Sequence, residues 1–471
     1  MSSRAGTKVW FAAALLAGLA LRAFFVLYHA RFDGDTLLYG DMAHNLLAHH
    51  VFGYTEDTGI QPTLIRLPGY PLFMAACFVL FGTANYVAVL WTQVTLDLIA
   101  CALLGVLAGR LLGSRAALAT VWLASLCPFT AHYSAIALAE SCCLFAAVLA
   151  FFAMERWLDA FCRNRNGLGW AVVCGFAQLF GILLRPDQAL LAMAFVPVML
   201  WGGVRGRQGR VSSLRCAAPA VVAALIIVLP LSLWAERNWR VFHVVQPLAP
   251  RYANDPGETN PDGFYRWYRT WGVEFKSTLD VYWPYVGGTL DMKDLPPRAF
   301  DSPQQRDETA ALIACYNQTT LPTTAIDVTF ARIAAERIKA QPLRYYLVLP
   351  VARELDMWLR PRTELMKLPL DFWNVRAHPG ASVAEFAIAV LNLAYLLLAV
   401  AGFIRWRRLG FSGQGMLAFA LVAFVVLRCI LLLTLDNSEP RYTLECFPVI
   451  ILLAGLVFAR KETPTIMNLS S

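Results

Sequence analysis

The chain has 471 residues, of which 58% are hydrophobic and only 15% are charged, with a net charge of +8. Soluble proteins carry about a quarter charged residues, and the apolar residues here also come in long blocks. This composition excludes an ordinary soluble enzyme and predicts an α-helical polytopic membrane protein. The positive charge does not indicate nucleic-acid binding, because much of it lies in short loops on one predicted face of the membrane.

The first apolar block, Val9–Tyr28, resembles a signal peptide, but no small-residue cleavage site follows it. We therefore predict an uncleaved first span with its N-terminal side in the cytoplasm. A polar segment over 29–68, here called loop one, follows. The apolar region over 69–112 is too long for one crossing and short for two, since a helix rises about 1.5 Å per residue. It predicts a surface helix over 71–81 and a span over 85–109.

Further apolar blocks predict more spans, which gives about ten transmembrane helices in all. These blocks lie at 117–134, 138–157, 168–184, 187–203, 216–235, 384–404, 414–435 and 443–459. Clusters of basic residues support this number, because they coincide with the segments that it places in the cytoplasm. The clusters are Arg4 and Lys8, Arg110 and Arg115, Arg156–Arg165, Arg205–Arg215, Arg405–Arg408, and Arg460 and Lys461. The opposite, non-cytoplasmic side then holds loop one, the large polar region and the turns at 134–140, 185–187 and 436–441.

The hydropathy pattern divides the chain into three parts. They are an N-terminal transmembrane region over 1–235 that contains loop one, a periplasmic domain over 236–382, and a C-terminal transmembrane region over 383–471. With about 150 residues, the domain is large enough to form its own core. Its pattern predicts an amphipathic helix over Ile326–Ala340, with Arg337 on the polar face. A second amphipathic helix over Leu343–Leu359 fits a membrane surface.

Loop one carries three carboxylates, Asp33, Asp35 and Asp41, just outside the first predicted span. Gly34 relaxes the backbone between the first two. Asp35 lies at or near a helix start, where a carboxylate can simply cap orphan N–H groups. The alternative hypothesis is that one of these acids is a catalytic base at the membrane surface, because a carboxylate can take a proton from an acceptor hydroxyl.

Other polar residues lie at the edges of predicted spans on the same side of the membrane. They are Arg66, Tyr70, Glu140, Arg185, Asp187, Glu439, Arg441 and Tyr442. Taken singly, the acids fit helix starts and the arginines fit snorkelling. Taken together, they suit transfer from a lipid phosphate, because arginines bind a phosphate leaving group through paired hydrogen bonds. The sequence contains no Walker, dinucleotide-binding, serine-hydrolase or zinc-protease motif, which argues against nucleotide-driven chemistry. The residues do not indicate a metal site, although they do not exclude a divalent metal.

Short motifs, in this order along the chain, resemble the bacterial branch of glycosyltransferase family 39. They are Asp35-x-x-x-Tyr39-x-x-x-Ala43-x-Asn45-Leu46-Leu47, Arg66-x-Pro68-Gly69-Tyr70-Pro71, Arg237-Asn238-Trp239 and Arg441-Tyr442. The resemblance covers most of the membrane part and little of the large domain. That family includes protein O-mannosyltransferases and the lipid A aminoarabinose transferase, and it has the C-type glycosyltransferase fold.

The resemblance implies an enzyme of the bacterial inner membrane that works on the periplasmic side. It would move a sugar from a polyprenyl-phosphate donor to a lipid, glycan or protein acceptor, with inversion if the displacement is direct. Asp35 matches the family's catalytic base and Glu140 its acid in the second outer loop, while Asp33 and Asp41 would support them. Thr36 stands where the family often has a second acid. The expected substrate-binding residues are Tyr39, Arg66, Tyr70, Arg185, Arg441 and Tyr442.

Two other classes of function remain open at this point. A transporter or lipid flippase would need ionisable groups near the bilayer midplane, and Asp97 is the clear acid within a predicted span. A structural or assembly protein would not need acids and arginines clustered on one outer face. The sequence itself therefore favours the enzyme.

Overall fold

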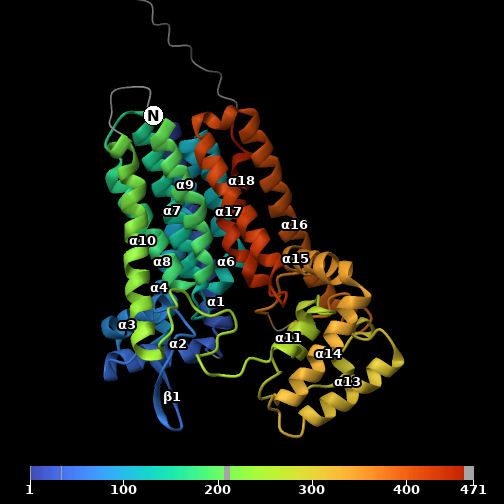
Figure 1. Cartoon of the computed structure of the whole chain (residues 1–471). Helices are drawn as coiled ribbons and strands as arrows, with labels where there is room; N and C mark the ends of the chain where they lie inside the picture. The colour runs from blue at the N-terminus through green and yellow to red at the C-terminus, as the bar shows by residue number, and fades with distance from the viewer. Residues whose placement is uncertain (1, 33, 206–212, 367, 461–471) are drawn as a thin grey trace, which may run out of the picture. The chain divides into compact units, whose positions relative to one another are not determined.

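The computed structural model describes residues 2–32, 34–205, 213–366 and 368–460. The chain divides into two compact units (Figure 1), and the first takes Met1–Ala249, Ala394–Phe424 and Cys446–Ser471. The second takes Pro250–Leu393 and Val425–Glu445. This division follows contacts, whereas the boundaries predicted from the sequence follow membrane sides, and those boundaries stay predictions.

Six of the described helices are long and apolar enough to cross a membrane. They are α1 (Ser2–His29), α4 (Tyr86–Leu112), α7 (Glu140–Cys162), α10 (Ser213–Phe242), α16 (Pro379–Arg408) and α17 (Gly415–Leu433). The first unit also contains shorter helices. Besides α2, which is described below with loop one, they include α3 (Gly69–Phe81), α5 (Ser114–Ser125), α6 (Pro128–Tyr133), α8 (Leu168–Leu184), α9 (Ala189–Arg205) and α18 (Phe447–Leu456). The predicted helical membrane architecture is confirmed, and the count of about ten spans stays a prediction.

Two predicted spans are interrupted in the structure. The block at 117–134 forms α5 and then α6, which begins at Pro128. The block at 443–459 begins in a 3-10 helix, Pro440–Cys446, before α18 starts at Phe447 with Pro448 in its first turn. Proline lacks an N–H and is tolerated at a helix start but not in the interior, so each break has a local cause.

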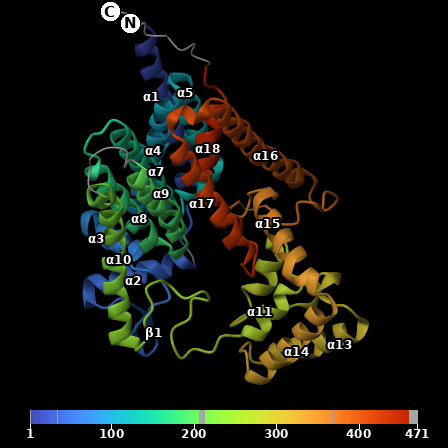
Figure 2. The same cartoon turned by 45° about the horizontal axis from the view of Figure 1, so that its top comes forward.

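Loop one folds into a helix and a hairpin at one end of the first unit. Helix α2 (Asp35–His49) is followed by antiparallel strands β1 (Gly53–Glu56) and β2 (Gly59–Pro62), and both views place them near α3 (Figures 1 and 2). Gly34 precedes α2 with a φ of 54°, a conformation that favours glycine. The middle of α2 packs against the hairpin, where Asn45 donates to the carbonyl oxygen of Gly53 at 3.3 Å.

The hairpin is held at both its strands and its base. The carboxylate of Asp41 accepts hydrogen bonds from the backbone N–H of Thr55 at 2.6 Å and from its hydroxyl at 2.9 Å. Arg237, near the end of α10, donates to the carbonyl oxygens of Thr63 at 2.8 Å and Phe52 at 2.9 Å. These contacts fix the polar connection between α2 and α3.

A buried ion pair joins three helices of the first unit. Arg22 of α1 donates to the carboxylate of Asp97 in α4 at 2.6 Å and to the carbonyl oxygen of Ser125 in α5 at 2.8 Å. Both charged side chains are almost fully buried, at 0% and 4% exposure. Because each charge is satisfied by the other, Asp97 has a structural partner within the bundle.

The second unit has an aromatic core formed by short helices. The helices are α11 (Asp262–Arg269), α12 (Phe275–Ser277), α13 (Pro303–Tyr316), α14 (Thr324–Ala340) and α15 (Leu349–Leu359), with a π-helical turn at Arg344–Val348. Trp267, Trp271 and Phe330 are fully buried in this core. Burial of large rings is a major stabilising contribution in a domain of this size. Helix α14 confirms the amphipathic helix predicted over Ile326–Ala340.

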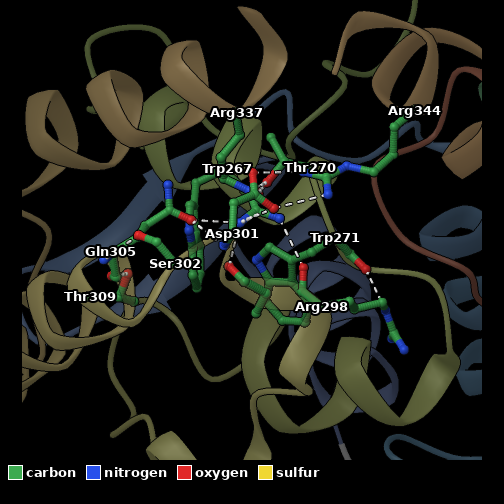
Figure 3. Close-up of polar contacts among 11 residues, drawn as sticks. Trp267, Thr270, Trp271, Arg298, Asp301, Ser302, Gln305, Thr309, Arg337 and Arg344 are labelled. Carbon is green, nitrogen blue, oxygen red and sulfur yellow. Dashed lines mark hydrogen bonds and ion pairs between the residues drawn. The ribbon is translucent and has the colours of Figure 1, made fainter. Parts of the chain in front are cut away.

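The position of Arg337 corrects the sequence prediction, because this residue lies in the core and not on the polar face. Figure 3 shows its guanidinium among oxygen atoms contributed by two neighbouring segments. It donates to the hydroxyl of Thr270 at 2.8 Å, to the side chain of Gln305 at 2.7 Å and to the carbonyl oxygens of Arg298 and Ala299. Asp301 lies 3.2 Å away and also pairs with Arg344 at 3.0 Å. The polar core group is tolerated because its donors find acceptors.

Candidate active site

Asp35 is the first residue of α2, directly after Gly34 in the N-cap position. Its carboxylate accepts a hydrogen bond from Arg66 at 2.9 Å, and both side chains remain partly exposed, at 32% for Asp35 and 24% for Arg66. Asp35 is thus an accessible acid at the edge of loop one, and both its helix-start role and its role as a base stay predictions.

A second ion-pair group lies at the ends of α7 and α8. Glu140, the first residue of α7, is bonded to Arg185 at 2.8 Å, and Arg185 also contacts Asp187 at 3.1 Å. Glu140 is 3% exposed, whereas Arg185 and Asp187 are each 16% exposed. Helix starts favour carboxylates, but here the arginine orients both acids. The turn predicted to be outward-facing at 185–187 is thus bonded to the start of α7.

Tyr39 lies between these two groups. The guanidinium of Arg66 lies 6.0 Å from its ring centre, and the pKa of its phenol responds to charges on Asp35, Glu140 and Arg185 as well. Burial is the largest influence and raises that pKa to about 12, with Asp35 and Glu140 adding to the shift and the arginines opposing it. The phenol therefore stays neutral at physiological pH and can both donate and accept a hydrogen bond.

Tyr70 extends this aromatic wall from α3. Its ring packs edge-on against Tyr39 at 4.9 Å. Gly69 lets the start of α3 approach α8 closely, because a side chain at this position would come within 2.5 Å of the backbone of Leu183, in the last turn of α8. The start of α3 can thus lie directly beside the end of α8, which leads into Arg185.

Gln93 is a site residue that the sequence analysis missed. It is fully buried in α4, accepts a hydrogen bond from the Tyr70 hydroxyl at 2.5 Å and donates to the carbonyl oxygen of Ile136 at 2.8 Å. The neighbouring carbonyl of Ala137 accepts a hydrogen bond from Thr36 at 3.1 Å. Gln93 therefore links the aromatic wall to the segment that holds the residue after Asp35. The available signal was a polar amide within an apolar span.

The structure does not bring every predicted site residue together. Asp41 faces the hairpin through its bonds to Thr55, and Asp33 lies outside the described residues. Arg441 and Tyr442 belong to the second unit, where Arg441 pairs with Glu439 at 2.6 Å. That Arg441 and Tyr442 bind substrate in the same site stays a prediction. In the first unit, the residues that do converge are Asp35, Tyr39, Arg66, Tyr70, Glu140, Arg185 and Asp187.

The converging residues carry a nearly balanced charge. Asp35 is paired with Arg66, and Arg185 lies between Glu140 and Asp187. Among the residues that the structure describes, no three histidine, cysteine, aspartate or glutamate side chains are grouped to hold a metal ion. The arrangement can position a proton-accepting carboxylate next to arginines that bind an anion.

Comparison with known proteins gives two kinds of likeness. Residues 62–234 match the family model described as dolichyl-phosphate-mannose-protein mannosyltransferase. Among solved structures, the archaeal oligosaccharyltransferase AglB from Archaeoglobus fulgidus is similar, with a TM-score of 0.50 at 12% identity. That alignment covers 96% of this chain and 50% of AglB, so the chain spans about half the length of that relative.

The solved structure of ArnT from Cupriavidus metallidurans is also similar, with a TM-score of 0.40 at 16% identity. That alignment covers 98% of this chain and 78% of ArnT. No curated protein sequence matches the chain. The family match confirms the resemblance to the mannosyltransferase family over a segment that contains Arg66, Glu140 and Arg185. The likeness to AglB confirms the predicted C-type glycosyltransferase fold, and the chain is a multi-pass membrane protein.

Proposed function

We propose that this protein is a glycosyltransferase that moves a sugar from a polyprenyl-phosphate donor to an acceptor at the outer face of the membrane. The observation that carries this proposal is the convergence of Asp35–Arg66 and Glu140–Arg185–Asp187 around Tyr39. The family match over 62–234 supports the same chemistry. In its solved complex, AglB holds a dolichol-phosphate, a lipid of the proposed donor class.

Asp35 acts as the general base in this proposal. Its carboxylate is exposed enough to meet an acceptor hydroxyl, and Arg66 fixes its orientation at 2.9 Å. The acceptor oxygen loses its proton to Asp35 as it attacks the anomeric carbon, and the bond to the phosphate oxygen breaks. Such a direct displacement inverts the anomeric centre. Asp41 contributes indirectly, because it holds the hairpin against α2.

Arg66 and Arg185 receive the phosphate leaving group. Both are oriented by carboxylates, and both retain some solvent exposure. A guanidinium can bond a carboxylate on one edge and a phosphate on another, since it has five donors. The negative charge that develops on the departing phosphate is then stabilised in a partly desolvated place. Tyr39, kept neutral by its high pKa, can donate to the same sugar or phosphate oxygens.

The transporter alternative loses its main support. Asp97 was its midplane acid, and the carboxylate is committed to Arg22 at 2.6 Å inside the bundle. A proton- or ion-coupled carrier needs an acid that changes partners during transport. The enzyme therefore accounts for more of the described polar residues.

Turnover in detergent tests the proposed function. Purified protein given a polyprenyl-phosphate sugar and acceptor is expected to release free polyprenyl phosphate, whereas a flippase releases none, because it moves the lipid without breaking the bond between sugar and phosphate. Arg66→Lys and Arg185→Lys should raise the KM for the donor, because lysine keeps the charge but loses the bidentate geometry. Arg163→Lys, on the exposed end of α7, is the matched control. Absence of release with every donor tried would contradict the enzyme.

The site is further proposed to lie on the periplasmic side of a bacterial inner membrane, together with the region over 236–382. The alternation of basic clusters supports this orientation. An alkaline phosphatase fused at about residue 290 should be active, and one fused directly after Arg408, at the end of α16, should be inactive. A cytoplasmic result at the first position would place the proposed site on the wrong side for an outer-leaflet donor.

A further inference from the structure

A row of exposed apolar side chains runs along the segment that contains the π turn and α15 of the second unit. Leu343 and Tyr346 are 66% and 68% exposed, and the row continues through α15 to its last residue. Its members are Leu343, Tyr346, Leu347, Val351, Leu355 and Leu359, here called the apolar row. Contiguous exposed apolar surface of this kind marks a contact with a membrane or another protein.

The π turn makes the row continuous. In an uninterrupted α-helix, Leu359 would lie about 160° around the axis from Leu343, since each residue turns about 100°. The turn at Arg344–Val348 is π-helical, and such a turn accommodates one extra residue. With that extra residue, the angle around the helix axis between Leu343 and Leu359 falls to about 60°, so both ends of the row lie on one face. A deviation from regular helix geometry thus aligns the apolar side chains.

The opposite face of the segment is fixed to the core of the second unit. Arg353 is 1% exposed and donates to the carbonyl oxygens of Arg269 at 3.2 Å and Gly272 at 3.1 Å. Burial lowers the pKa of Arg353 to about 10, so it remains charged at neutral pH. Because the buried face is anchored, the apolar row is a fixed surface and cannot turn inward.

The end of α15 lies against residues deep within α16 and α17. The side chain of Asn392 in α16 donates to the carbonyl oxygen of Trp358 at 2.7 Å. The side chains of Glu354 and Trp358 also reach Cys429 in α17. Both partner helices are long and apolar enough to cross a membrane. The end of α15 therefore lies beside turns of two helices that are apolar enough to be surrounded by lipid.

We propose that the segment over 343–359 lies in the plane of the membrane interface, with the apolar row buried among lipid chains. In the same unit, α16 also exposes Val383, Phe386 and Val390. Tyr346 and Trp358 are the residue types that favour the headgroup boundary. The partner of this surface is the lipid bilayer, and the segment adds a membrane contact of the second unit beside α16 and α17.

Fluorescence quenching by lipid tests this placement. A fluorophore is attached to Val351→Cys or Leu355→Cys in a full-length background with Cys162→Ser, Cys216→Ser and Cys315→Ser. Cys162 and Cys315 are the exposed cysteines among those that the structure describes. Each protein is reconstituted in nanodiscs of phosphatidylcholine with or without bromine on the acyl chains. The control label is at Glu336→Cys, an exposed position on α14 of the same unit. Labels in the apolar row should be quenched several-fold more than the control label.

The outcomes separate the lipid surface from other partners. Equal quenching at Val351, Leu355 and Glu336 would overturn the proposal. The proposal would also be overturned if labels in the row were protected from a water-soluble quencher only at high protein concentration. That result would identify a second copy of the protein as the partner. Two row positions are used so that a folding defect in one variant does not decide the result.

Discussion

Replacement of Asp35 by asparagine is expected to lower turnover by about a hundred- to ten-thousand-fold, which is the usual contribution of a general base. Asparagine keeps the size of the side chain and can still accept the hydrogen bond that Arg66 donates at 2.9 Å. Donor binding and folding should therefore change little. The measurement is donor turnover by purified protein, with donor affinity and thermal unfolding determined in parallel.

Asp41→Asn is the matched control, because it makes the same change six positions along the same helix. Its carboxylate accepts two hydrogen bonds from Thr55 in the hairpin, so we expect a stability effect with no loss of the chemical step. If Asp35→Asn keeps near wild-type turnover and Asp33→Asn does not, Asp33 is the base. If none of the three substitutions alters turnover, the proposed reaction itself is wrong.

Arg337→Met should destabilise the second unit by about 3–5 kcal/mol, the usual cost of removing one partner from a buried charged group. The substitution keeps an unbranched chain but removes the donor to the oxygens of Thr270 and Gln305 and to the carbonyl oxygens of Arg298 and Ala299. Asp301 keeps its pair with Arg344, so the cost comes from the buried acceptors. Burial lowers the pKa of Arg337 to about 10, so the native side chain is charged at neutral pH. Hydrogen exchange of the full-length protein should show increased exchange across α11, α13 and α14.

Arg332→Met on the same helix is the matched control. Arg332 is 47% exposed and pairs with Glu336 at 2.6 Å on the surface. Exposed pairs contribute about 1 kcal/mol or less, so this variant should behave almost as the native protein does. Equal protection in both variants would show that the core does not depend on Arg337.

Patterns that act over many residues were predictable from the sequence. Apolar block length identified the membrane architecture, and helical spacing identified α14. Charge alternation predicted one common side for Asp35, Glu140 and Arg185, and in the structure all three contribute to the ion pairs around Tyr39. These patterns can be recognised in a single sequence because they depend on whether a segment meets lipid or water, and not on its individual contacts.

Individual partners were not predictable in the same way. Helical periodicity placed Arg337 on the polar face, because a single sequence does not reveal that Thr270 and Gln305 would supply acceptors in the core. The capping preference of aspartate suggested a local role for Asp35, but it did not reveal the long-range bond from Arg66. Gln93 was hidden in an apolar span for the same reason. These interactions join segments far apart in the chain, so no local pattern encodes them.

The ion pair between Arg22 and Asp97 also bears on how the protein enters the membrane during synthesis. An arginine or an aspartate alone at the centre of a helix costs about 2.5–3.5 kcal/mol to insert. Since each of these side chains is neutralised by the other, α1 reaches its most stable position only after α4 has been made. Before α4 has been inserted, α1 should therefore be less stably integrated in the membrane. The test compares stalled chains that end before and after Leu112. Alkaline extraction should remove the shorter chains from the membrane more readily than the longer ones.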